Sequence, residues 1–165
     1  MATQLKNLSD FSNTTIPNAG PYRFGIVVAE WNAKITGALY GGAYQSLIDH
    51  GVLEENIFTY AVPGSFELTS GADILLKHKN LDAVICLGCV IQGETRHFDF
   101  ICAAVANGIS NVAIKYEKPV IFGVLTTDNE QQAFDRAGGK HGNKGVEAAV
   151  TAIKMVDFAN QLQNN

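Results

Sequence analysis

The sequence predicts one α/β domain in three layers, with a central four-stranded parallel sheet between two layers of helices. Four short apolar runs rich in β-branched residues alternate along the chain with segments of helical periodicity. A chain of 165 residues is long enough for one such domain with its own core. We place this domain at residues 21–165, with right-handed crossovers between its strands. Residues 1–20 are polar and are expected to form an irregular arm.

The strands are expected to be buried and the helices to be amphipathic. Ile35, Leu39, Ala43 and Leu47 recur at every fourth residue, and Gly51 follows where a helix cap is expected. Ser65 is expected to cap the second helix. Residues 138–142 are rich in glycine and predict a flexible link. The predicted strands are residues 24–29, 57–62, 81–91 and 120–125, and the predicted helices are residues 35–48, 65–78, 98–116, 130–137 and 144–163.

The composition is more apolar than that of an average globular domain. Hydrophobic residues make up 47% of the chain and charged residues only 17%. Two interpretations are open, a large core within one chain or a subunit that buries surface in an oligomer. We favour the oligomer, because obligate interfaces are rich in apolar surface.

Charge and hydropathy exclude several classes of partner. The net charge is −4 and there is no basic run, which argues against nucleic-acid binding. The apolar runs are shorter than a membrane span, and the first 20 residues lack the layout of a secretory signal. Together with an odd, sparse set of cysteines, this predicts a cytoplasmic protein. Cys86 and Cys89 lie within an apolar strand, which favours packing over a redox pair or a metal site.

Functional side chains should gather at the carboxyl ends of the strands, where open α/β sheets bind ligands. The turns that reach this edge are residues 30–32, 63–67, 92–98 and 126–128. Trp31 and Phe66 lie in the first two turns, beside polar groups. They would suit a flat heterocycle with hydroxylated attachments.

The turn that contains Gly93, Glu94 and Thr95 is a candidate anion site, because it opens a helix directly after a strand. Many such turns hold glycine and threonine without binding a ligand. His97 could carry protons near neutral pH, or it could only cap the helix. Asp99 could orient His97 or simply stabilise the first helical turn.

Positive charge appears again late in the chain. Arg136 suits bidentate binding of phosphate, although a solvated link before a helix would look similar. His50 and His78 lie near predicted helix ends and are expected to be structural. A Ser-His-Asp triad is not supported, because no serine has the context of a nucleophile elbow.

Four segments taken together resemble the 6,7-dimethyl-8-ribityllumazine synthase family of riboflavin biosynthesis. They are VPGSFE at 62–67, GETRHFD at 93–99, KPVIFGVLT at 118–126 and RAGGKHGNKG at 136–145. They occur in the family's order and spacing, and the resemblance extends over residues 24–162. It implies a flavodoxin-like sheet and a transferase that condenses 5-amino-6-(D-ribitylamino)uracil with 3,4-dihydroxy-2-butanone 4-phosphate, releasing phosphate and water. No metal or organic cofactor is implied.

The resemblance also implies a role for each matched residue. His97 would be the proton donor and acceptor, and Trp31 would stack on the pyrimidine. Glu94 and Thr95 would bind phosphate together with Arg136. Phe122 and Arg136 would reach the site from the adjacent subunit, and His141 and Lys144 would have secondary roles. The pyrimidine and the ribityl chain would contact Ser65, Phe66, Glu67, Cys89, Val90 and Ile91.

The family assembles as pentamers or as icosahedral shells of twelve pentamers. The link at residues 138–142 has no insertion, which favours the shell, and riboflavin synthase is a candidate partner. Two rival functions remain, a non-catalytic flavin-binding shell protein and a flavodoxin-like electron carrier. The intact 93–97 turn and Arg136 count against the first. Residues 30–34 lack the Ser, Thr and Gly donors that the second would need for a flavin phosphate.

Overall fold

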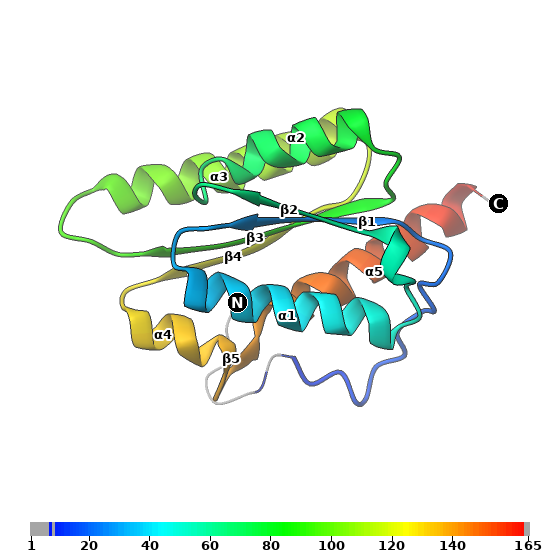
Figure 1. The fold of residues 1–165 in the computed structure, drawn as a ribbon, viewed down its shortest axis with the longest axis horizontal. Coiled ribbons are helices and arrows are strands. Elements are labelled where there is room, and N and C mark those ends of the chain that lie inside the picture. The colour runs from blue at the N-terminus through cyan, green and yellow to red at the C-terminus, as the bar shows by residue number, and fades with distance from the viewer. Residues whose placement is uncertain (1–6, 8, 164–165) are drawn as a thin grey trace.

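The computed structural model describes residue 7 and residues 9–163, and it confirms the three-layer α/β/α fold (Figure 1). All four strands of the main sheet are parallel, in the order β2-β1-β3-β4. In chain order the elements are β1 (Phe24–Ala29), α1 (Ala33–Asp49), a 3₁₀ turn (Glu54–Asn56), β2 (Ile57–Val62), α2 (Leu68–His78), β3 (Ala83–Ile91), α3 (His97–Tyr116), β4 (Val120–Thr127), α4 (Glu130–Asp135), β5 (Ala137–Gly139), β6 (Gly142–Asn143) and α5 (Lys144–Gln163).

The two central strands are buried on both faces, but β2 is not. In β3, residues 83–89 are buried, and alternate side chains enter the hydrophobic clusters on opposite faces of the sheet. The prediction that β2 is buried was wrong, because Thr59, Tyr60 and Ala61 are exposed. β2 is an edge strand with a neighbour on one side only, so the helices that cover β1 and β3 leave much of it uncovered.

Helices α1, α4 and α5 cover one face of the sheet (Figure 1). The predicted stripe of Ile35, Leu39, Ala43 and Leu47 is almost fully buried on this face. α5 approaches α1 so closely that a Cβ on Gly145 would lie 1.9 Å from the Leu39 carbonyl oxygen. Only glycine fits there, which fixes where α5 begins.

Helices α2 and α3 cover the other face, and α3 has an unusually apolar surface. Val105, Ile109 and Val112 pack α3 onto the sheet, yet only 17% of its most apolar window is buried. By length and composition α3 could span a membrane, which the expectation of short apolar runs did not anticipate. In the structure this helix packs as one layer of the α/β core and leaves most of its apolar surface uncovered.

Residues 138–142 form a tight hairpin, so the prediction of a flexible link was wrong. β5 and β6 pair antiparallel, with Gly138 and Gly142 at positive φ. The Asn143 side chain accepts hydrogen bonds from the Gly145 and Val146 amides at 2.8 and 3.4 Å and donates to the Ala38 carbonyl at 2.9 Å. Glycine signals a change of direction, but the contact of Asn143 with Ala38, 105 residues away, is not visible in the local sequence.

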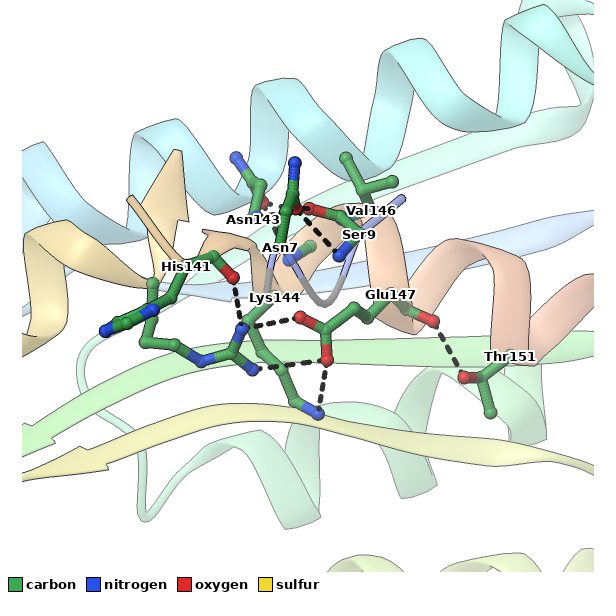
Figure 2. A network of polar contacts seen from close by, with 10 residues as sticks. Asn7, Ser9, His141, Asn143, Lys144, Val146, Glu147 and Thr151 are labelled. Atoms are coloured by element: carbon green, nitrogen blue, oxygen red, sulfur yellow. Dashed lines mark hydrogen bonds and ion pairs between the residues drawn. The ribbon is translucent and has the colours of Figure 1, made fainter. Parts of the chain in front are cut away.

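The described part of the N-terminal arm is irregular, as predicted, but it packs on the domain. The Ala19 side chain is fully buried, and its amide donates to the His50 carbonyl at 2.8 Å. Ser9 accepts a hydrogen bond from the Asn143 amide at 2.7 Å (Figure 2). Residues 1–6 and 8 of the predicted arm lie outside the described residues.

Candidate active site

A cavity of about 590 Å³ opens at the carboxyl ends of the strands. Its walls come from the turns after β1 and β2, the last residues of β3 and the start of α3. The lining residues are Trp31, Asn32, Gly64, Ser65, Phe66, Glu67, Cys89, Val90, Ile91, His97 and Ile101. The cavity therefore lies where parallel sheets of this kind bind ligands.

Two large aromatic side chains of this cavity are exposed to solvent. Trp31 is 74% exposed and Phe66 is 55% exposed. Such apolar surface is unfavourable in water and becomes favourable when a flat ring covers it. The two residues follow β1 and β2, which are adjacent in the sheet. A planar heterocycle at this edge would contact both turns.

Ser65 lies in the turn before α2 rather than at the helix cap, so the prediction that it caps the helix was wrong. The helix begins at Leu68, with Glu67 at the N-cap position. The Ser65 Oγ atom is buried and has no hydrogen-bond partner within the described chain. A Cβ on Gly88 would lie 2.6 Å from that oxygen, so glycine makes room for it. A buried hydroxyl without a partner costs about 1–3 kcal/mol, which a hydroxylated ligand could offset.

Cys86 and Cys89 pack on opposite faces of the sheet, which confirms their role in packing. Cys86 belongs to the cluster under α2 and α3, and Cys89 to the cluster under α1 and α5. Burial raises the pKa of the Cys86 thiol to about 12 and that of Cys89 to about 11. All three cysteines are free. Within residues 7 and 9–163, no three His, Cys, Asp or Glu side chains come together in a metal-binding group.

The 93–97 turn presents backbone donors to solvent just before α3. The amides of Gly93, Glu94 and Thr95 donate no hydrogen bond within the described chain, and all three residues are exposed. The Gln92 side chain braces the loop by donating to the Gly93 carbonyl at 2.7 Å. Free amides at the start of a 20-residue helix form a favourable environment for an anion.

His97 is the first residue of α3, and its side chain lines the cavity. Its ring makes no hydrogen bond within the described chain, so both ring nitrogens are available to a ligand. Asp99 does not orient it. The Asp99 carboxylate instead pairs with Arg96 at 3.7 Å, in a largely exposed contact. This contact agrees with the alternative in which Asp99 stabilises the first turn of α3 rather than orienting His97.

Arg136 does not line the cavity, and its side chain is paired with Glu147 of the same chain. Its guanidinium donates to both carboxylate oxygens of Glu147, at 2.7 and 3.2 Å, and to the His141 carbonyl at 3.0 Å. Lys144 approaches the same carboxylate at 3.4 Å (Figure 2). The side chains of Arg136 and Glu147 are only 18% and 15% exposed. One carboxylate thus faces two cations, so these three side chains together carry one net positive charge.

Phe122 does not line the cavity of its own chain either. It is partly buried in the middle of β4, against the cluster under α2 and α3. The structure therefore divides the predicted site residues into two groups. The first group, on the turns after β1 and β2, on β3 and at His97, lines one cavity. The second group does not line it: Glu94 and Thr95 lie in the turn just before α3, and Phe122, Arg136, His141 and Lys144 lie elsewhere.

Asn32, Gly64 and Ile101 line the cavity although they were not among the predicted site residues. Ile101 lies four residues after His97 in α3, so helical periodicity places it on the same side. Asn32 follows Trp31 in a turn that the topology had already placed at the ligand-binding edge. These signals were present in the sequence, but no single residue type marked them.

The comparisons with known proteins agree on one family. The family model described as 6,7-dimethyl-8-ribityllumazine synthase matches residues 21–160. A protein of that name from Cytophaga hutchinsonii is 64% identical over 156 residues, which cover 94% of this chain and 98% of the relative. One from Flavobacterium johnsoniae is 56% identical, covering 98% and 85%. One from Parabacteroides distasonis is 56% identical, covering 96% and 99%. The chain therefore belongs to the 6,7-dimethyl-8-ribityllumazine synthase family.

Proposed function

We propose that this protein is a transferase that condenses 5-amino-6-(D-ribitylamino)uracil with 3,4-dihydroxy-2-butanone 4-phosphate to give 6,7-dimethyl-8-ribityllumazine. The observation that carries the proposal is the cavity in which Trp31, Phe66 and the end of β3 meet His97. The membership in the family supports the same reaction. In this arrangement the pyrimidine stacks on Trp31, and Ser65, Phe66 and Glu67 hold the ribityl chain.

The reaction needs proton transfers at each of its steps. The amine attacks the ketone to form an imine with loss of water, phosphate leaves, and the resulting enol rearranges. Ring closure then releases a second water. We assign the proton transfers to His97, since this residue lines the cavity and its ring makes no hydrogen bond to another described residue. A placed general acid–base contributes about 10²–10⁴-fold. Bringing the two substrates together in a reactive geometry can contribute more, up to about 7–11 kcal/mol of the barrier.

The phosphate group is assigned to the amides and hydroxyl of the 93–95 turn, together with Arg136. The turn supplies free donors at a helix N-terminus, and Arg136 supplies a planar cation suited to bidentate binding. Arg136 is turned toward Glu147 of its own chain and does not line its own cavity. We therefore propose that it serves the cavity of an adjacent subunit, as Phe122 does.

An oligomer is further supported by the apolar surface that a single chain leaves exposed. Phe100 and Ile114 on α3 are 67% and 73% exposed, in a helix whose apolar window is mostly uncovered. Such surface is typical of subunit interfaces. We propose homopentamers, assembled as twelve pentamers in a shell, in the cytoplasm. Light scattering or negative-stain microscopy that detects only pentamers would contradict the shell but not the pentamer.

One assay tests the activity against its rivals. Both substrates are mixed with the purified protein, and the fluorescence of the lumazine product and the release of phosphate are followed together. Equal production of both supports the proposal. Tight riboflavin binding with negligible turnover would instead identify a non-catalytic binding protein.

A further inference from the structure

Asn32 adopts a backbone conformation that asparagine tolerates and most residues avoid. Its φ and ψ are 62° and 44°, in the left-handed region. In the described part of the chain, the other non-glycine residue with positive φ is Glu117, which ends α3. A left-handed residue is common at the end of a helix but not at its start, where the N-cap residue is normally extended. Asn32 therefore has a conformation that capping does not explain.

The side chain of Asn32 is also used in an unusual way. An asparagine at the N-cap normally accepts a hydrogen bond from the first helical turn, but Asn32 makes no such bond. Its Nδ2 instead donates to the Cys89 carbonyl oxygen at 3.0 Å, across 57 residues of sequence. The side chain thus connects the start of α1 to β3.

This hydrogen bond lies just beyond the point where β1 stops pairing with β3. β1 ends at Ala29, and the last matched pair of β1 and β3 is Val28 with Leu87. β3 continues to Ile91, so Cys89 lies beyond the end of β1. The side-chain amide of Asn32 therefore donates to a β3 carbonyl that lies beyond the end of β1. This carbonyl belongs to the segment of β3 that lines the cavity.

Hydrogen bonds connect the turn that carries Trp31 to neighbouring segments on two sides, toward β2 and toward β3. On the β2 side, the Glu30 amide donates to the Val62 carbonyl at 2.8 Å and the Trp31 amide to the Pro63 carbonyl at 3.2 Å. On the β3 side, the only such connection among the described residues of the turn is the Asn32 side chain. Trp31 is 74% exposed, so little packing of its own holds it in place.

We propose that Asn32 is a positioning residue, which holds Trp31 at the cavity wall through its left-handed backbone and its hydrogen bond to the Cys89 carbonyl. The bond keeps the indole and the β3 segment at the separation that a flat ring requires. The catalytic part of the inference rests on the proposed function. The positional part concerns the free protein and does not depend on it.

Three variants separate the contribution of the left-handed backbone of Asn32 from that of its side-chain hydrogen bond. Asn32→Gly keeps access to positive φ but removes the side chain. Asn32→Asp has a similar tolerance of positive φ, but replaces the donor with an acceptor that faces the Cys89 carbonyl. Asn32→Ala loses both the donor and the favoured backbone. Glu117→Gly is the control, because it relaxes the other left-handed residue at the opposite end of the domain.

Trp31 is the only tryptophan in the chain, so its fluorescence reports the turn directly. Time-resolved anisotropy of each free protein measures the sub-nanosecond motion of the indole without any turnover. We expect a larger fast component in all three Asn32 variants, largest in Asn32→Ala, and no change in Glu117→Gly. Circular dichroism and light scattering establish that each variant is folded and assembled like the wild type.

Steady-state kinetics provide the second measurement. We expect the KM for the ribitylaminouracil to rise about 3- to 10-fold in Asn32→Gly and Asn32→Asp, as for the loss of one hydrogen bond, with kcat within about twofold. A wild-type fast component together with a wild-type KM in either variant would overturn the proposal. If the wild-type protein had no synthase activity, the proposed function would fail while the anisotropy would still test the position of Trp31.

Discussion

The cavity edge and the β5–β6 hairpin both carry proposed site residues, but the two regions are built in opposite ways. At the cavity edge, Trp31 and Phe66 are largely exposed, and the His97 ring makes no hydrogen bond to another described residue. At the hairpin, Arg136 is mostly buried and makes two charge-assisted contacts with Glu147. The cavity residues therefore have apolar surface and ring nitrogens available to a ligand, whereas Arg136 at the hairpin is already paired with Glu147.

This difference bears on the proposal that two subunits share one site. An exposed cationic side chain would pay a large entropy cost when it is ordered against a phosphate. Arg136 is ordered before any ligand arrives, because Glu147 and the His141 carbonyl already hold its guanidinium. The cavity residues in turn leave apolar surface that a ring and a second subunit can cover. Substitutions in the two regions should therefore have different consequences.

The largest effect is expected from His97→Ala in the cavity. Loss of the proton carrier should lower kcat by about 10²–10⁴-fold without abolishing turnover, since substrate positioning is retained. Stability should change little because the ring is exposed. Single-turnover and steady-state rates of lumazine formation measure this. Complete loss of turnover in a folded variant would refute the division between proton transfer and positioning.

Arg136→Ala should have the next largest effect, and it should act on binding. Removal of a charged hydrogen-bonding group is expected to raise the KM for the phosphorylated substrate about 10- to 100-fold. The KM for the ribitylaminouracil should remain close to that of the wild type. Separate titrations of the two substrates check this selectivity. An unchanged KM for the phosphorylated substrate would remove Arg136 from the phosphate site.

Glu147→Gln tests whether the charge of Glu147, paired with Arg136, stabilises the folded protein. The substitution keeps the shape and one acceptor but removes the carboxylate from a mostly buried pair with Arg136. We expect the free energy of unfolding to fall by about 1–3 kcal/mol, less than for a fully buried pair. Urea denaturation measures the change. A double-mutant cycle with Arg136→Ala should show coupling between the two residues, and independent effects would contradict the cluster.

Much of this arrangement could be predicted from the sequence, and the exceptions have a common cause. The spacing of Ile35, Leu39, Ala43 and Leu47 predicted a buried helix face, because that pattern is local. The carboxyl-edge turns predicted where Trp31, Phe66 and His97 would meet, because parallel topology fixes that edge.

The hairpin and the position of Asn32 could not be predicted in the same way. The link at residues 138–142 is followed by Asn143, whose side chain donates to the Ala38 carbonyl in α1, 105 residues away in sequence. The bond from Asn32 to Cys89 spans 57 residues. Ser65 has the residue type of a helix cap, but the helix begins three residues later and the hydroxyl is left without a partner. Local propensity does not contain these long-range contacts.

The smallest effect is expected from Asp99→Asn, which removes the ion pair nearest to the cavity. Asp99 and Arg96 have side chains that are 60% and 84% exposed, so solvent and salt screen their attraction. Asp99 also lies in the first turn of α3, where a negative charge is favourable. The two contributions together should lower the free energy of unfolding by about 0.3–1 kcal/mol, with kcat within about threefold. Urea denaturation of Asp99→Asn and Glu147→Gln side by side measures the difference between their free energies of unfolding. A loss equal to that of Glu147→Gln would mean that exposure does not distinguish the two ion pairs, and a large fall in kcat would return Asp99 to a role beside His97.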